Sequence, residues 1–349
     1  MEALGYAMQS PTDDLAPFRF VRRALRPNDV QIDILFCGVC HTDLHISRNH
    51  GGYTNYPVVP GHEIVGRVAA IGSAVTGFTV GQQVGVGCMV DSCQHCAACD
   101  AGEEESCREG ATFTYNGTDR HDQSRTFGGY SNMIIVSDKF VLRIPDSLDL
   151  AGAAPLLCAG ITTWAPLRRW KVGPRSKVAV IGLGGLGHMA LKLAHALGAD
   201  VTLFTRSPGK EEDALRLGAD RVVLSTEPAQ MAEVMGRFDL VIDTVPYAHD
   251  LNPYLPTVAT HGTLVLVGFM GPLDPPVNGG ALVFGQKAIA GSFIGGIAET
   301  QQMLDFCGAH GIVSDVEVIA MAEVNTAWER MLSSDVKYRF AIDMATLAV

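Results

Sequence analysis

The stretch VIGLGGLGHMA, residues 180–190, places three glycines in the order G-x-G-x-x-G: Gly182, Gly184 and Gly187. It follows an apolar, strand-like run and precedes a helix-like segment at 186–197. Further strand-like and helix-like segments alternate after it in the sequence. The tetrapeptide Leu-Gly-Ala-Asp occurs twice, each time at the end of a helix-like segment that a strand-like segment follows. Repeated strand–helix units predict a doubly wound parallel sheet of the α/β class, the Rossmann fold.

These glycines fit a turn that binds a dinucleotide. Gly182 permits the tight turn, Gly184 lets the backbone approach a pyrophosphate, and Gly187 permits close packing of the helix on the sheet. The N-terminus of the helix would then offer free N–H groups to the phosphates. A glycine-rich turn without a ligand is the alternative interpretation.

The acid that would bind the ribose of NAD is missing from the end of the next strand. In NAD-binding examples an Asp or Glu stands about 20 residues after the glycines. Here the segment reads LFTRSPGK, and its four donors, two of them cationic, are Thr205, Arg206, Ser207 and Lys210. Such donors suit a 2′-phosphate, so the segment predicts NADP(H), unless these are simply exposed loop residues and the cofactor choice is loose.

Four cysteines cluster in the first part of the chain, which is otherwise rich in short strand-like runs. The segment CQHCAACDAGEEESC has the spacing C-x2-C-x2-C-x7-C and contains Cys93, Cys96, Cys99 and Cys107. Four thiolates in one short loop suit tetrahedral zinc and fill its coordination shell, so the ion would be structural. An iron–sulfur cluster is the main alternative, and four unrelated surface thiols is the other.

The amino-acid composition and the N-terminal sequence restrict the binding partners and the cellular compartment that we expect for this protein. The formal net charge of −11 disfavours nucleic acid and anionic membranes, because both attract basic surfaces. The N-terminal segment does not read as a signal peptide, and no run of about 18 uncharged apolar residues occurs. We therefore expect a cytoplasmic protein with reduced thiols that does not enter a membrane.

Six further motifs carry a family resemblance: CGVCHTDLH, PGHEIVG, PLLCAGITT, GLGGLGH, GSFIGG and KYRFAID. With the four-cysteine segment, they resemble the zinc-dependent medium-chain alcohol dehydrogenases. The resemblance is closest to the cinnamyl-alcohol-dehydrogenase branch and its bacterial broad-range NADPH-dependent aldehyde reductases, and it covers essentially the whole chain. It implies a GroES-like, β-rich catalytic domain with the zinc sites at 1–158 and 296–349, and a Rossmann NADP-binding domain at 159–295.

The resemblance also implies a catalytic zinc. Its ligands would be Cys40, His62 and Cys158, with Glu63 as a nearby or alternating ligand. These residues are far apart in the sequence, and spacing alone does not join them. Two Cys and one His leave an open fourth position on zinc, which is the arrangement of a catalytic site.

Further roles follow from the same resemblance. Thr42 and His45 would form a proton relay from the substrate oxygen to solvent, although a His beside a metal site is often only packed there. His41 and Arg339 would meet cofactor phosphates, and Thr162 would lie near the nicotinamide. The remaining implied cofactor contacts are Gly185, Leu186, Thr244, Val267, Ser292 and Ile294.

Together these features predict two zinc ions per chain. They also predict an oxidoreductase that transfers hydride between NADPH and small-molecule aldehydes or primary alcohols. These substrates would be cinnamyl-type aromatic or aliphatic compounds. A related zinc dehydrogenase acting on a polyol or a formaldehyde adduct is one alternative, and a non-enzymatic protein that binds zinc and nucleotide is another. The segment KAIAGSFIGG, residues 287–296, matches a strand that pairs across a two-fold axis in the family. We therefore expect a homodimer, with a tetramer as the alternative.

Overall fold

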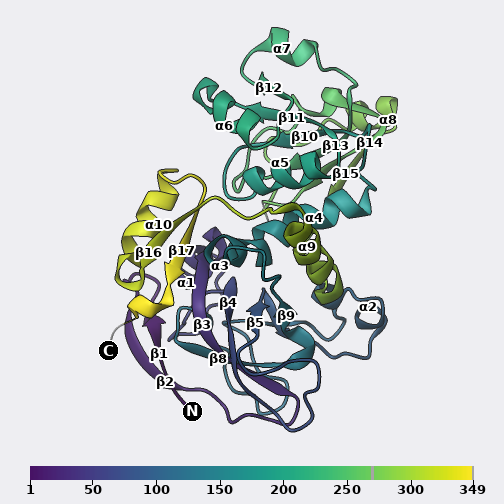
Figure 1. Cartoon of the computed structure of the whole chain (residues 1–349). Coiled ribbons are helices and arrows are strands. Elements are labelled where there is room, and N and C mark those ends of the chain that lie inside the picture. Colours follow the sequence, from purple (N-terminus) through teal and green to yellow (C-terminus); the bar gives the residue numbers. More distant parts are fainter. Residues whose placement is uncertain (269–270, 348–349) are drawn as a thin grey trace. The chain divides into compact units, whose positions relative to one another are not determined.

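The computed structural model describes residues 1–268 and 271–347. Contacts divide the chain into two compact units (Figure 1). Unit 1 combines Met1–Ile161 with Gly295–Val349, and unit 2 is the continuous segment Thr162–Ile294. Unit 1 is thus built from two pieces of chain that are separated in the sequence by the whole of unit 2.

Unit 2 contains a six-stranded sheet in which every neighbouring pair is parallel. Its strands, in spatial order, are β12 (Arg221–Leu224), β11 (Asp200–Thr205), β10 (Lys177–Ile181), β13 (Phe238–Asp243), β14 (Val258–Leu266) and β15 (Ala288–Gly291). Numbered along the chain, this order is 3-2-1-4-5-6, the order of the doubly wound dinucleotide-binding fold. The predicted Rossmann fold is therefore confirmed.

Helices cover the sheet; the first of them precedes the first strand along the chain, and the others connect strands. They are α4 (Ala159–Arg169), α5 (Gly187–Ala196), α6 (Glu211–Arg216), α7 (Pro228–Ala232) and α8 (Gly279–Gly285). The helix α5 packs on β10 and β11 (Figure 1). Gly198 and Gly218, from the repeated tetrapeptide, have φ of 84° and 103° and lie just after α5 and α6. A left-handed residue ends a helix, and glycine adopts that conformation without steric cost.

Unit 1 is built around a seven-stranded sheet. Its strands run in the order β16 (Val316–Ala320), β17 (Arg339–Asp343), β3 (Asp29–Val39), β4 (Ile64–Ile71), β5 (Gln83–Val86) and β9 (Leu142–Arg143), while β8 (Met133–Ser137) also pairs with β3. All pairs are antiparallel except β16 with β17. The strand β17 pairs directly with β3, so the carboxyl-terminal piece of the chain completes the sheet begun by the amino-terminal piece.

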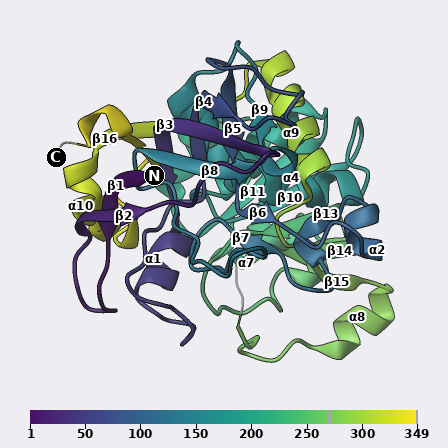
Figure 2. The ribbon, with the colours of Figure 1, turned by 90° about the horizontal axis from the view of Figure 1, so that it is seen from below.

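Two hairpins and several short helices surround this sheet. The hairpins are β1 (Glu2–Ala7) with β2 (Ala16–Val21), and β6 (Met89–Asp91) with β7 (Thr112–Phe113). The helices are α1 (His41–Ser47), α2 (Ala97–Asp100), α3 (Leu150–Ala153), α9 (Ile297–His310) and α10 (Val324–Leu332). The β1–β2 hairpin lies beside α10 (Figures 1 and 2), where the backbone of Leu15 exchanges two hydrogen bonds with the Asn325 amide.

Within the described ranges, no single helix has the length and apolar composition to cross a membrane. One pair of helical segments, Leu150–Leu157 and Ala159–Arg169, passes that test only when taken together, and the two are bent by 56°.

Candidate active site

Four potential metal ligands meet in unit 1. One ligand atom from each of Cys40, His62, Glu63 and Cys158 lies within 4.8 Å of the others. Cys40 follows β3 and caps α1, His62 and Glu63 directly precede β4, and Cys158 stands between a 3-10 turn and α4. None of the four is more than 9% exposed. The fold therefore gathers side chains that spacing alone could not join.

Asp43 organises these ligands, and the sequence analysis did not single it out. Its carboxylate is fully buried and lies 2.9 Å from Nδ1 of His62. It also accepts hydrogen bonds from the backbone N–H groups of Cys40 (3.1 Å) and Gly61 (3.0 Å). A histidine that binds metal through one ring nitrogen commonly donates the other N–H to a carboxylate, which fixes its ring orientation. Asp43 holds the His62 ring in that way, and the other ring nitrogen, Nε2, is then available to bind a metal ion.

Glu63 and Arg339 form a buried pair beside the cluster. The Arg339 guanidinium contacts Oε1 of Glu63, and Oε2 is buried without a hydrogen-bond partner. Burial raises the pKa of Glu63 to about 7, against the opposing charge of Arg339. An orphaned carboxylate oxygen among two thiols and an imidazole is a ready donor for a cation. We expected Arg339 to reach a cofactor phosphate, whereas its partner in the structure is Glu63; the phosphate contact stays a prediction.

The charge around Cys40 favours a metal-binding thiolate. A hydrogen bond from the Cys158 thiol is the largest influence that holds the pKa of Cys40 well below its usual value, and the charges of Arg339 and His62 act in the same direction. The thiolate, not the thiol, is the form that binds metal. Two sulfurs and one imidazole nitrogen are donors that zinc prefers, and they leave a position open for substrate. The residues present thus fit a catalytic zinc.

The four cysteines of the second cluster also come together. One ligand atom from each of Cys93, Cys96, Cys99 and Cys107 lies within 4.8 Å of the others. Backbone N–H groups point at the sulfurs: Cys93 N lies 3.4 Å from Cys107 Sγ, and Arg108 N lies 3.4 Å from Cys96 Sγ. Backbone hydrogen bonds, first from Cys99 and then from Arg108, lower the pKa of Cys96 to about 6. Four sulfurs so arranged fit a closed, structural zinc site.

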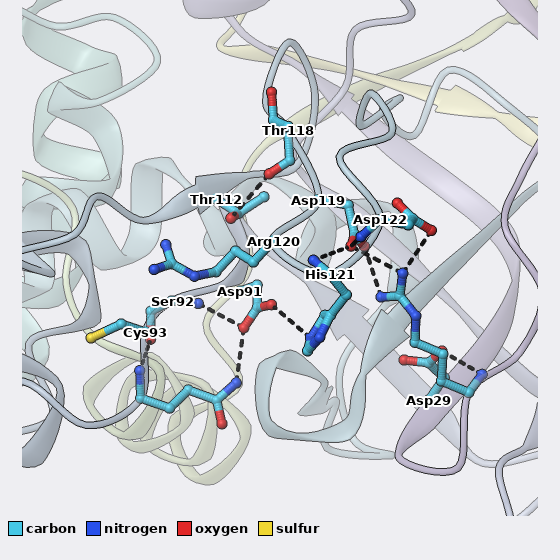
Figure 3. Close-up of polar contacts among 12 residues, drawn as sticks. Asp29, Asp91, Ser92, Cys93, Thr112, Thr118, Asp119, Arg120, His121 and Asp122 are labelled. Carbon is cyan, nitrogen blue, oxygen red and sulfur yellow. Dashed lines mark hydrogen bonds and ion pairs between the residues drawn. The ribbon is translucent and has the colours of Figure 1, made fainter.

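A network of hydrogen bonds and ion pairs holds the start of this four-cysteine lobe (Figure 3). Asp91 accepts hydrogen bonds from Ser92 N and Gln94 Nε2, both at 2.8 Å, and its other oxygen lies 3.6 Å from His121 Nε2. Two residues before His121, Asp119 makes a bidentate pair with Arg26, at 2.9 and 3.0 Å. All of these residues except Ser92 line a cavity of about 610 Å³ in unit 1. The network ties the 119–122 segment both to the lobe and to the loop that precedes β3.

The glycine turn of unit 2 has the geometry that a dinucleotide needs. Gly182 has φ of 89°, and a Cβ on Gly187 would lie only 2.1 Å from the Gly182 carbonyl oxygen. Nothing lies within 4 Å of the position of a Cβ on Gly184, so its backbone is open to a ligand. The turn connects the end of β10 to the start of α5 through Gly185 and Leu186. Phosphates fit this cradle at the helix N-terminus.

The predicted 2′-phosphate donors follow the end of β11. Thr205 ends the strand, is 6% exposed, and accepts a hydrogen bond from Ser207 N at 3.1 Å. Lys210 donates from Nζ to the carbonyl of Leu183 at 2.9 Å, which places its charge beside the glycine turn. Arg206 is exposed and lies 3.3 Å from the hydroxyl of Tyr247, a residue that the sequence analysis had not named. Two cationic residues thus follow the end of the strand at which NAD-binding examples have an acid.

The other expected cofactor residues lie mainly past the carboxyl ends of the strands, the edge where ligands bind in open α/β sheets. Thr244 follows β13 and donates from Oγ1 to the Ile181 carbonyl at 2.8 Å. Val267 follows β14, Ser292 and Ile294 follow β15, and Thr162 lies in α4. The structure thus places these residues at a common edge or in the linking helix, and their contacts with a cofactor stay predictions.

The expected relay residues share the short helix α1, with His41 and Thr42 in its first turn and His45 in its last. Thr42 and His45 are both exposed and stand three positions apart, so they lie on the same side of the helix. Nδ1 of His45 lies 2.7 Å from Nδ1 of His50, which the sequence analysis had not named. The signal for His50 was weak, because a lone histidine in a polar turn has no motif around it.

A zinc-dependent dehydrogenase requires a fold for a dinucleotide and a metal site with a position free for substrate; this chain has the fold, and its clustered residues fit the metal site. Comparisons with known families agree. The Alcohol dehydrogenase GroES-like domain matches residues 26–146, and the Zinc-binding dehydrogenase family matches residues 185–309. The chain belongs to the zinc-dependent medium-chain alcohol dehydrogenases.

Individual relatives span nearly the full length. The chain is 51% identical over 344 residues to NADP-dependent alcohol dehydrogenase C 1 of Mycolicibacterium smegmatis, covering 98% of each. It is 50% identical over 351 residues to aldehyde reductase YahK of Escherichia coli, covering 99% of each. Among solved structures, a cinnamyl alcohol dehydrogenase from Sorghum bicolor has a TM-score of 0.95 and 46% identity, with 99% of this chain and 98% of that chain covered. The predicted family and branch are thereby confirmed.

Proposed function

We propose that this protein is a zinc-dependent, NADPH-dependent aldehyde reductase that also oxidises primary alcohols. The observation that carries the proposal is the open metal cluster of Cys40, His62 and Cys158 in a chain that also has a dinucleotide fold. The relatives support it, since one is named for NADP-dependent alcohol dehydrogenation and another for aldehyde reduction. Small-molecule aldehydes and alcohols are accordingly the substrate class.

Cys40, His62 and Cys158 would hold the catalytic zinc, with Glu63 close enough to serve as an alternating ligand. The four-cysteine lobe would hold the structural zinc, which makes two ions per chain. When bound, zinc supplies Lewis-acid polarisation of an oxygen and NADPH supplies hydride. The chain's own task is to orient these groups, and Asp43 does so by fixing the His62 ring.

Thr42 and His45 would handle the proton of the reaction. The Thr42 hydroxyl would donate a hydrogen bond to the substrate oxygen, and His45 would exchange the proton onward. Burial, and then the nearby charge of His50, lower the pKa of His45. A neutral imidazole near neutral pH can accept a proton, which general acid–base catalysis requires.

The preference for NADPH would come from the end of β11. Arg206 and Lys210 supply positive charge, Thr205 and Ser207 supply donors, and no acid stands there to repel a phosphate or bind free ribose hydroxyls. Lys210 already lies against the glycine turn through Leu183. Charge-assisted hydrogen bonds to a phosphate are about twice as strong as neutral ones, so this set favours the phosphorylated cofactor.

A metal analysis and a substrate panel test this proposal together. We expect two zinc ions per chain in carefully purified protein, and reduction of aromatic and aliphatic aldehydes with NADPH in preference to NADH. If the protein turned over a polyol or a formaldehyde adduct faster than every aldehyde, its substrate class would differ from the proposed one. Metal binding without any turnover would show a binding protein instead of an enzyme.

We further propose a cytoplasmic homodimer. The strand β15 is an edge of the parallel sheet, and α8 lies near that edge (Figure 2). Three apolar side chains here are exposed: Val283 (75%), Phe284 (93%) and Phe293 (50%). An uncovered strand edge with apolar neighbours invites pairing, and a second copy would cover both. Light scattering at micromolar concentration should give twice the chain mass, and Phe284→Glu should shift the equilibrium toward monomer; a monomeric wild type refutes the dimer.

A further inference from the structure

A second group of potential metal ligands lies at the surface of the four-cysteine lobe. One ligand atom from each of Cys93, His95 and Glu109 lies within 4.8 Å of the others. Nε2 of His95 lies 2.9 Å from a carboxylate oxygen, Oε1, of Glu109, and these two side chains are 71% and 50% exposed. Cys93 therefore belongs to two groups at once, this exposed group of three ligands and the group of four cysteines.

The local backbone orients the His95 ring. Nδ1 of His95 faces the carbonyl oxygen of Cys93, which only accepts hydrogen bonds, so Nδ1 carries the hydrogen and Nε2 is directed toward Glu109. Gln94, between the two, has φ of 61°, a left-handed conformation that is uncommon for Gln, and its side chain donates to Asp91 at 2.8 Å. A histidine that binds metal commonly donates its second ring N–H to a carbonyl in this way.

Arg120 orients the other exposed ligand, Glu109. Its guanidinium donates to Oε2 of Glu109 at 2.7 Å and to the Gly110 carbonyl at 2.8 Å, which leaves Oε1 on the side of His95. The charge of Arg120 also offsets that of the carboxylate, and this weakens the attraction of the exposed group for a divalent ion. The three ligands are thus held in position by their neighbours, but their exposure and low net charge suit brief binding of an ion.

The sulfur of Cys93 connects the exposed group to the other cysteines. It lies 3.8 Å from Sγ of Cys99, which in turn lies 3.6 Å from Sγ of Cys96. The other sulfurs are therefore within reach of an ion that keeps Cys93 as a ligand. Four thiolates close the coordination shell of zinc, and a second divalent ion beside the first would be repelled. The two groups therefore suit a single ion at successive times.

We propose that Cys93, His95 and Glu109 form a loading site through which a divalent ion enters and leaves the four-cysteine lobe. The ion is one that accepts sulfur, nitrogen and oxygen donors, and zinc has this property. During entry the other three cysteines replace His95 and Glu109, while Cys93 stays bound. The inference rests on the structural zinc of the proposed function and adds to it the route by which that ion is exchanged.

The first test combines His95→Gln with Glu109→Gln in the full chain, which also carries Cys40→Ala so that zinc in the lobe is followed alone. Partners that only orient a ligand contribute about 10–100-fold to metal affinity, so removal of two direct ligands of the loading site should slow zinc release to a chelator about tenfold or more. Uptake of zinc after chelation should slow by the same factor. Groups on the route that are absent from the final shell leave the equilibrium unchanged, so the lobe should still bind one zinc with the same affinity.

The matched control combines Glu103→Gln with His310→Gln. Glu103 is an exposed carboxylate of the same lobe, so its substitution removes the same charge, and His310 is an exposed histidine of the same unit. The control should release and take up zinc at the rates of the parent chain. Equal slowing in the control would show that the charge of the lobe sets these rates, and it would overturn the loading site.

Cobalt gives a second readout, because its thiolate charge-transfer band reports how many sulfurs are bound. Uptake of Co²⁺ by the Cys40→Ala chain should pass through a species with a weaker band than the final four-sulfur species, and the double variant should lack that first species. Unchanged release and uptake in the double variant overturn the loading site, and so does a third zinc ion that stays bound in the wild type. If Cys99→Ala removes no zinc from the protein, the structural zinc itself fails, and the loading site is withdrawn with it.

Discussion

Asp43→Asn tests the role of the buried carboxylate behind the metal cluster. The substitution keeps the size and shape of the side chain but replaces one acceptor oxygen with an NH2 donor. Oδ1 of Asp43 faces Gly61 N and His62 Nδ1, and Oδ2 faces Cys40 N and the Tyr130 hydroxyl. Whichever way the amide is turned, its NH2 group meets two donors.

The magnitude follows from these contacts. Two hydrogen bonds to a charged group are lost, at about 1.5–3 kcal/mol each, so the variant should lose about 3–6 kcal/mol of stability. The group is fully buried, and water does not replace the lost bonds. Removing a carboxylate that orients a metal-binding histidine also weakens metal affinity by about 10–100-fold. We therefore expect Asp43→Asn to fold less stably and to release zinc from one site only.

A chelator competition with metal analysis measures this directly. Asp43→Asn should lose one zinc per chain at a chelator concentration that leaves two in the wild type, and its thermal midpoint should fall by at least about 6 °C. Asp146→Asn, an exposed carboxylate of the same unit, is the control and should match the wild type. The reasoning is refuted if Asp43→Asn retains both ions with unchanged affinity and melts within about 1 °C of the wild type.

Five further substitutions, in three predictions, address the other parts of the molecule. Cys40→Ala should abolish turnover and leave most of the stability. Cys99→Ala should lower the thermal midpoint more than Cys40→Ala does, because structural zinc contributes folding free energy. Equal losses of stability in the two variants would contradict this division of roles between the two zinc sites. Arg206→Ala should reduce the preference for NADPH in kcat/KM about tenfold or more, since a charge-assisted hydrogen bond to the phosphate contributes about 1.5–3 kcal/mol. Thr205→Asp should shift cofactor use toward NADH. A wild type that favours NADH would exclude the predicted preference for NADPH. Burial opposes ionisation of Asp119, but its bonds to Arg26 and to backbone N–H groups hold its pKa at about 2, below the usual 3.8. Its stabilising contribution is present above that usual value and is lost as the pH falls toward 2, so Asp119→Asn should unfold with a weaker dependence on pH in that range than the wild type.

The fold was predictable from the sequence because local patterns determine it. The strand β10, the glycine turn and the helix α5 have periodicity and glycine placement that act within about 20 residues. The four-cysteine lobe was visible for the same reason, since its ligands lie within one short segment. Cys158 was different: its approach to Cys40 and His62 depends on how unit 1 folds as a whole, and only the family resemblance pointed to it.

Asp43 and His50 show what sequence reasoning missed and why. Asp43 stands three positions after Cys40 and accepts from its backbone N–H, which is the position of an acid at the start of a helix. That pattern predicts that Asp43 caps a helix. The second role of Asp43, as the hydrogen-bond partner of His62, depends on where β4 begins. His50 pairs with His45 only because Asn49 takes a left-handed conformation, and a sequence does not display that conformation.

The two-piece construction of unit 1 has a consequence for how the chain is made. The strand β3 reaches its place in the amino-terminal piece, but its neighbour β17 is among the last segments that a ribosome adds. About 180 residues separate Ile161 from Arg339, and at about 5–20 residues per second their synthesis takes about 9–36 s. During that interval β3 lacks its β17 partner and Glu63 lacks its cation, while unit 2 already has all its strands once Ile294 has emerged. The nascent enzyme therefore completes the half that binds nucleotide before the half that binds metal.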